Sequence, residues 1–106
     1  MRTKPEDFEK LLMEAVDEGL KSLGESGRRM VFFHLEKSYS IKKQDIPKKP
    51  EAFAEGLKKI FGTGASVLEE MIVKSLYSKL GLEYESQRNY VFADYLRNLG
   101  TIKQDQ

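Results

Sequence analysis

The stretch from residue 50 to residue 64, PEAFAEGLKKIFGTG, carries both the beginning and the end of a helix. Pro50 suits a first helical turn because its φ angle is already helical and its missing N–H needs no partner there, and Glu51 lies near the positive end of the helix dipole. Gly62 and Gly64 break the pattern. The apolar residues of the stretch recur at helical spacing: Phe53, Leu57, Ile60 and Phe61. The stretch predicts an amphipathic helix over 50–61 followed by a tight corner.

Residues that begin and end helices also occur towards the N-terminus. Apolar residues at helical spacing predict a helix over 5–23, which Gly24 ends in a left-handed conformation. Ser26 offers the N-cap of a second helix that runs to Ser38. The run Met30–Phe33 inside it also fits a buried strand, because aromatic and β-branched residues cluster there. We prefer the helix, since Phe32 and Val31 pair with Leu35 at three- and four-residue spacing. Leu35 in turn pairs with Tyr39 at four-residue spacing.

Towards the C-terminus the pattern predicts two more helices. One covers 65–80, with Gly81 and Leu82 closing it in a Schellman motif. The other is capped by Ser86, carries its apolar residues over 91–99, and ends at Gly100.

Between the second and third helices, Ser40 is expected to cap a short helical turn over 41–45. Ile46 is expected to be extended, because the following residue, Pro47, disfavours the α conformation. Together these elements predict an all-α fold, a compact bundle of about five helices in a single domain over residues 1–100, with 101–106 as a frayed tail.

The composition excludes several classes of protein. The chain has 106 residues, with no Cys and no Trp, so disulfides and thiolate metal sites are excluded. No apolar run approaches the ~20 residues of a membrane span, and the charged first ten residues lack the apolar core of a signal peptide. We therefore expect a soluble protein of the cytoplasm.

The candidate catalytic and binding motifs are weak. His34 is the only histidine, and no nucleophile motif adjoins it, so we expect a structural or interfacial role unless a pocket gathers it with acids. The turn 62–64 lacks the lysine of a phosphate-binding P-loop. The acid pairs 6–7, 17–18 and 69–70 lack the histidine spacing of bundle metal sites and are interpreted as solvated faces. We expect no catalytic residue, cofactor or metal, and hence no enzyme.

Charge and aromatic residues favour binding instead. Net charge is +1, yet residues 28–61 carry nine Lys or Arg against four acids. This basic third is suited to acidic protein partners or to phosphates. Its candidate contacts are Arg28, Arg29, Lys42, Lys43, Lys48 and Lys49. Tyrosine is favoured at interfaces, so a homodimer or another protein interface is expected at Tyr84, Tyr90 and Tyr95.

One family resemblance covers about half of the chain, from Arg28 to Leu82. Its matching features are His34-Leu35-Glu36, Ile41, Ile46-Pro47, Pro50-Glu51, Phe53, Ile60-Phe61-Gly62, Gly64-Ala65, Leu76 and Gly81-Leu82. In these positions the chain resembles the Nitrosopumilus-type output domain of archaeal signalling proteins. The resemblance implies an archaeal helical module for regulation or signal transduction and transfers no catalytic residue. The expected function is a non-catalytic interaction module, with a small helix-turn-helix-like nucleic-acid binder as the alternative.

Overall fold

Five α-helices make up most of the protein in the computed structural model, which describes residues 5–88 and 90–104. No strand occurs in those two ranges, so the all-α prediction is confirmed and Met30–Phe33 is helical. Short 3₁₀ turns join several of the helices: η1 (Lys21–Leu23), η2 (Lys43–Lys48) and η3 (Gly62–Gly64). The helices are α1 (Pro5–Leu20), α2 (Gly24–Tyr39), α3 (Pro50–Phe61), α4 (Ala65–Lys79) and α5 (Phe92–Gln104).

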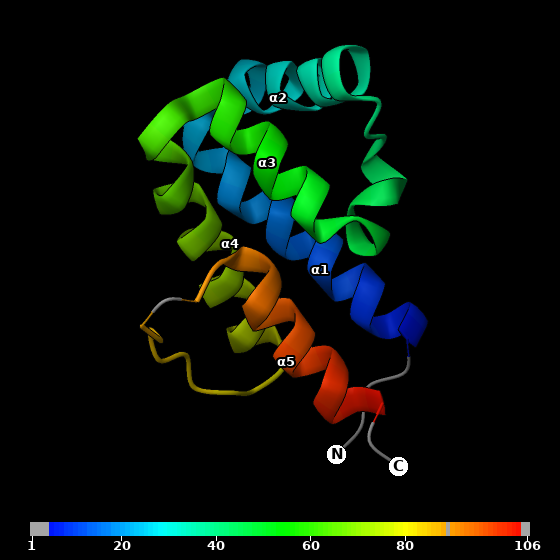
Figure 1. The fold of residues 1–106 in the computed structure, drawn as a ribbon, viewed down its shortest axis with the longest axis vertical. Helices are drawn as coiled ribbons and strands as arrows, with labels where there is room; N and C mark the ends of the chain where they lie inside the picture. The colour runs from blue at the N-terminus through cyan, green and yellow to red at the C-terminus, as the bar shows by residue number, and fades with distance from the viewer. Residues whose placement is uncertain (1–4, 89, 105–106) are drawn as a thin grey trace.

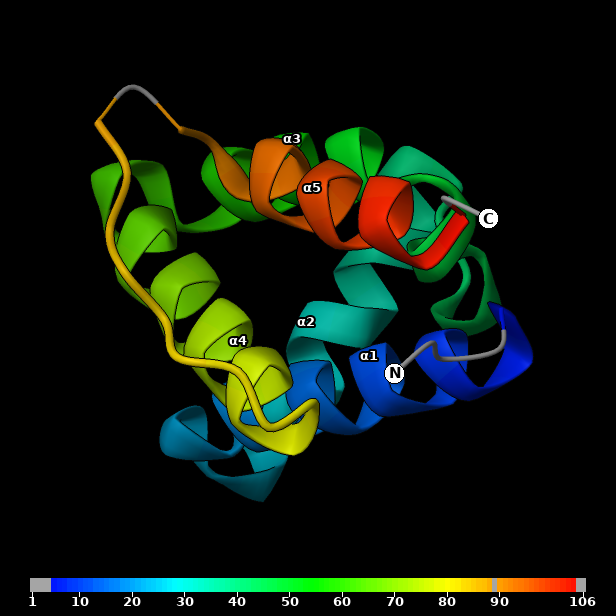
Figure 2. The ribbon, with the colours of Figure 1, turned by 90° about the horizontal axis from the view of Figure 1, so that it is seen from below.

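The helices form one compact bundle of 38 × 27 × 22 Å. α1 packs along α4 in the most extensive helix pair, and α3 contacts α2, α4 and α5 (Figure 1). α3 and α5 lie side by side on one face of the bundle, and the connector between α4 and α5 runs along α4 before it turns into α5 (Figure 2). None of the helices in the described ranges has both the length and the apolar character that a membrane crossing requires.

One continuous apolar core holds all five helices. α3 contributes Phe53 and Leu57, both fully buried, as the stripe within 50–61 predicts. The ring of Phe53 lies 5.6 Å from that of Phe92, which joins α3 to α5. Ile72 and Leu76 of α4 are equally buried. Tertiary burial of these stripes, rather than intrinsic helix propensity, supplies most of the stability of such helices.

Two glycines allow close helix crossings. A Cβ atom added to Gly19 of α1 would lie 2.5 Å from Cγ1 of Ile72 in α4, and one added to Gly56 of α3 would lie 2.5 Å from Cδ2 of Leu35 in α2. Carbon atoms prefer about 3.5–4.0 Å. Neither position therefore admits a side chain without a shift of its neighbour.

Several predicted helix ends are correct. α3 begins at Pro50 and ends at Phe61 as predicted. At the end of α4, the Gly81 amide donates to the Ser78 carbonyl and the Leu82 amide donates to the Tyr77 carbonyl. Gly81 has a φ of +74°. These are the two hydrogen bonds of a Schellman motif, which confirms that prediction.

Other predicted ends in the first half of the chain are wrong. Gly24 has a positive φ, +83°, but its ψ of 166° is not left-handed helical, and α2 begins at Gly24, so Ser26 lies inside the helix. Ser40 does not cap the next turn. It ends α2 in the left-handed conformation, and its amide donates to the carbonyls of Leu35 and Glu36.

The turn after α2 also starts later than predicted. It covers Lys43–Lys48, and the Lys42 amide at its start donates to the carboxylate of Asp45. Ile46 lies within this 3₁₀ turn instead of being extended, and its side chain is fully buried. Burial of that apolar side chain outweighs the local preference that Pro47 imposes.

The last helix differs at both ends. α5 starts at Phe92 rather than near Ser86, and the Val91 amide donates to the Asp94 carboxylate, which satisfies one of the free N–H groups at a helix start. The helix continues through Gly100 to Gln104, so Gly100 does not end it. Residues 105 and 106 of the predicted tail lie outside the described residues. So does Thr3, whose hydroxyl and position before Pro5 suit a helix N-cap.

Candidate functional site

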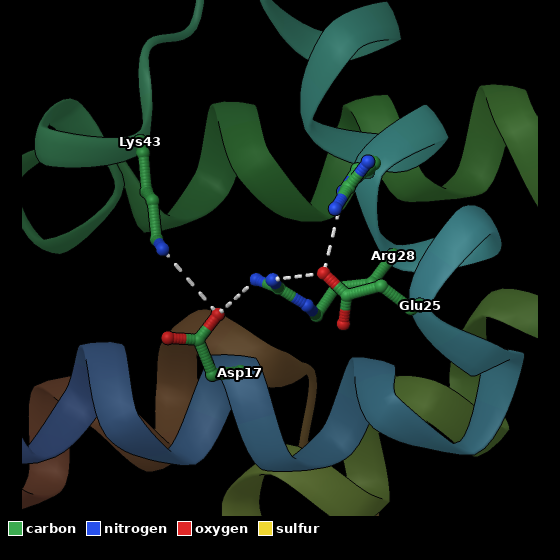
Figure 3. Close-up of polar contacts among 5 residues, drawn as sticks. Asp17, Glu25, Arg28 and Lys43 are labelled. Carbon is green, nitrogen blue, oxygen red and sulfur yellow. Dashed lines mark hydrogen bonds and ion pairs between the residues drawn. The ribbon is translucent and has the colours of Figure 1, made fainter.

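Arg28 and Lys43, two of the six predicted basic contacts, form one network with acids of the same chain. Nη1 of Arg28 lies 2.9 Å from Asp17, and Nη2 lies 2.9 Å from Glu25. Nζ of Lys43 lies 3.5 Å from the same Asp17 oxygen (Figure 3). Both cations also lie over the ring of Phe32, at 5.8 and 4.9 Å from its centre. The network joins α1, α2 and η2, which gives Arg28 and Lys43 a structural role.

The other predicted basic residues lie at the surface. Arg29 is exposed and pairs with Glu25 at 3.3 Å. Lys42, Lys48 and Lys49 flank or end η2 and are exposed, and no ion pair joins them to another residue in the described ranges. Among the six predicted basic contacts, these three lysines are the ones without an ion pair in the described ranges.

The three predicted interface tyrosines gather in one cluster with a fourth. The ring of Tyr95 lies 4.9 Å from Tyr90, 5.6 Å from Tyr84 and 6.5 Å from Tyr77. Tyr95 is buried at 7% exposure, whereas Tyr90 is 37% exposed. The cluster joins α4, the connector and α5, so these rings stabilise the fold as well as lining a surface.

Hydrogen bonds fix the hydroxyl at the centre of the tyrosine cluster. The Gln87 amide donates to Oη of Tyr95 at 2.8 Å. Burial raises the pKa of Tyr95, but the hydrogen bonds from Gln87, Tyr84 and Ser86 outweigh burial and lower it. Burial, together with the hydrogen bond to Tyr95, raises the pKa of Tyr84 to about 12. The pair shares one hydrogen-bonded network in which Tyr84 stays protonated at neutral pH.

A cleft of about 670 Å³ opens between α3, the start of α4, the connector and the start of α5. We call it the tyrosine cleft. Its size is within the range of 300–1,000 Å³ typical of ligand sites. Val91 at its rim is an exposed apolar side chain, at 61%. Its walls include Ala54, Glu55, Glu69, Tyr84, Tyr90 and Val91.

The walls of the tyrosine cleft are acidic. Four glutamates and one lysine line it, so the ionisable side chains of the walls sum to −3 when all are charged. Glu51 is bound by Arg97 at 2.9 Å, and Glu70 lies 3.9 Å from Lys74. Glu69 is half-buried, and removal from water raises its pKa, although Lys58 opposes that effect. The sequence interpretation of Glu69 and Glu70 as a solvated face missed this site, since the opposite wall comes from distant segments.

The remaining predicted motifs lie outside the tyrosine cleft or form only part of its wall. His34 is half-buried on α2, its ring 5.9 Å from that of Phe33, and it does not line the cleft. Gly62 and Thr63 form part of the cleft wall as backbone. Within the described ranges, no three His, Asp or Glu side chains are arranged to hold a metal ion. His34 and the tyrosine cleft are therefore separate features of the fold.

Comparison with known proteins adds no relative. No family model, no curated protein and no solved structure matches the chain.

Proposed function

We propose that the protein is a non-catalytic helical interaction module of the cytoplasm, acting in regulation or signalling, and that it receives a partner protein in the tyrosine cleft. The observation that carries the proposal is the cleft itself. It combines a volume suited to a short segment of chain with partly exposed tyrosine and valine side chains at its rim. Aromatic side chains of this kind are enriched at protein interfaces.

The valines at positions 91 and 67 allow a matched test. Val91 lies in the cleft and is 61% exposed, while Val67 on α4 is 60% exposed and lies outside the cleft. Burial of a valine side chain is worth about 1.5–3 kcal/mol, so loss of the exposed part at a contact costs about 1 kcal/mol. That cost corresponds to roughly a five-fold weaker Kd.

The experiment uses a partner captured from a lysate of expressing cells, then identified, purified and titrated by calorimetry. Val91→Ser should weaken binding of the purified partner about five-fold, whereas Val67→Ser should leave the Kd within about two-fold. Equal effects of the two variants, or no partner whose binding depends on Val91, would overturn the proposal.

A second candidate function is nucleic-acid binding, which the three exposed lysines around η2 favour. Each phosphate contact contributes about −0.9 to the slope of log affinity against log salt. Gel shifts with random duplex DNA should then show a slope of about −2.7, and Lys42→Gln, Lys48→Gln or Lys49→Gln should each reduce it by about 0.9. Lys10→Gln on α1 is the control. The absence of any shift at low salt and micromolar protein would eliminate this candidate.

A further inference from the structure

We propose that the tyrosine cleft recognises a lysine side chain carried by an extended segment of the partner protein. The inference rests on the proposed function and specifies the chemistry of the partner. It differs from the sequence expectation, in which the basic third of the chain attracts acidic partners, because the concave site has the opposite charge.

The charges that line the cleft are complementary to a cation. Of the four glutamates in the cleft, Glu51 already has a guanidinium partner and Glu70 has a distant ammonium partner. Glu55 and Glu69 have neither a hydrogen bond nor an ion pair to any other residue in the described ranges. They lie on α3 and α4, on walls of the same cleft, where Lys58 is the one lysine or arginine. An incoming cation would therefore meet two carboxylates without ion-pair partners.

Glu69 is half-buried, and its side chain forms no hydrogen bond in the described ranges. Such a carboxylate is costly, because the charge has lost part of its water and has only the through-space attraction of Lys58 in return. Charged groups that are removed from water in proteins are normally paired. An ammonium group placed beside Glu69 supplies the missing partner, and closure of the cleft by a ligand strengthens the pair by excluding water.

The tyrosine rings in the cleft wall are also suited to bind a cation. Tyrosine faces attract ammonium groups within about 6 Å of the ring centre. The cluster already shows this contact, since Nζ of Lys74 lies 5.8 Å from the ring centre of Tyr84. The four methylene groups of a lysine side chain can lie along tyrosine and alanine surface while the ammonium reaches a carboxylate. A lysine fits a cleft of acids and rings better than a purely apolar or an acidic side chain does.

The test is a titration of the ¹⁵N-labelled full chain with the pentapeptide Ac-Ala-Lys-Ala-Lys-Ala-NH₂, followed by NMR. Four parallel titrations use the same peptide with acetylated lysines, the peptide with glutamates in place of lysines, spermidine, and the lysine peptide at 0.5 M salt. We expect the lysine peptide to shift amides of the cleft walls, with Ala54, Ser66 and Tyr84 as reporters. The acetylated and acidic peptides should bind at least ten-fold more weakly.

Matched substitutions place the effect in the cleft. Glu55→Gln and Glu69→Gln should each weaken binding of the lysine peptide about five-fold. Glu36→Gln on α2 and Glu83→Gln in the connector change the net charge equally at exposed positions outside the cleft, and they should alter the Kd less than two-fold. High salt should weaken binding of the lysine peptide.

Four outcomes would overturn the inference. Three of them are no shifts in the cleft at millimolar lysine peptide, equal binding of the acetylated peptide, and equal losses from the cleft and control glutamates. The fourth is tighter binding of spermidine than of the lysine peptide, because the site would then select a small polyamine rather than a lysine of a protein chain. The proposed function stands separately. If the purified partner depends on Val91 but binds equally well to Glu55→Gln and Glu69→Gln, the lysine inference fails and the interaction site remains.

Discussion

Replacement of Gly19 by alanine should destabilise the protein, although alanine is the better helix former. Inside a helix the change from glycine to alanine contributes about 0.5–1 kcal/mol of stability. Here the new Cβ atom would lie 2.5 Å from Cγ1 of Ile72, whose side chain is fully buried. The backbone N of Ile72 is also near, at 3.4 Å, so α1 and α4 must separate by about 1 Å to restore ordinary contact.

The expected magnitude comes from setting overpacking against propensity. Overpacking of a core costs typically 1–3 kcal/mol, and the very short contact with a fully buried side chain places this case in the upper part of that range, at about 2–3 kcal/mol. After the propensity gain is subtracted, a net loss of about 1–2.5 kcal/mol remains. The entropy of unfolding of a chain of this length is about 220 cal/mol/K near the midpoint, so Tm should fall by about 5–11 °C. Circular dichroism at 222 nm during thermal unfolding measures this directly.

Gly64 provides the control for this prediction. Its φ is −66°, within the range of any residue, and an added Cβ would lie 3.9 Å from Phe61, an ordinary contact. Alanine stabilises the fold by making the unfolded chain less flexible, but it is a poorer N-cap residue than glycine at the start of α4. Because these two effects on stability oppose each other, Gly64→Ala should move Tm by less than about 3 °C. If Gly19→Ala raised Tm, as propensity alone requires, the close crossing of α1 and α4 would be refuted.

Three further substitutions test the core, the start of α5 and the tyrosine cluster. Phe53→Ala removes a fully buried ring and should cost about 3–5 kcal/mol in urea unfolding, and a loss below 1 kcal/mol would contradict its central place. The hydrogen bond from the Val91 amide, with help from Arg97, lowers the pKa of Asp94, so its stabilisation is present above the unfolded pKa of about 4 and is lost at lower pH. Asp94→Asn should therefore lower Tm at pH 7 and leave it unchanged near pH 2; an equal loss at both values would refute the charge-based explanation. Burial raises the pKa of Tyr84 to about 12, so the folded state holds a proton that the unfolded chain releases above about pH 10, and stability falls there. Tyr84→Phe should make that alkaline fall in Tm smaller, and an unchanged fall would exclude Tyr84 as its source.

Local signals explain which parts of the fold could be predicted. The ends of α3 and the C-terminus of α4 follow from residues within one turn of each boundary, namely Pro50, Gly62 and Gly81. The start of α5 could not be predicted in the same way. The cap there is a carboxylate three residues into the helix that accepts from the backbone of Val91, and serine at position 86 gave a stronger but misleading signal. Position 46 shows the reverse case, in which burial decides the backbone conformation.

The candidate site depended on contacts between distant parts of the chain. Arg28 meets Asp17 eleven residues away on another helix, so its charge could not be assigned to a surface from local sequence. The sequence singles out the tyrosines by residue type as a predicted interface, but their packing on one another is a tertiary property. The cleft combines the acids of α3 and α4 with uncharged residues of the connector, and neither helix alone distinguishes Glu69 from an exposed acid.

The pairing of α1 with α4 has a consequence for synthesis on the ribosome. About 45 residues separate the end of α1 from the start of its main packing partner. Translation proceeds at about 5–20 residues per second. The apolar face of α1 is therefore synthesised roughly 2 to 9 s before α4, the helix that covers it, begins to be made. During this interval a chaperone can bind the exposed apolar face of the nascent chain. Slower elongation within residues 21–64 should lengthen the interval and lower the yield of folded protein.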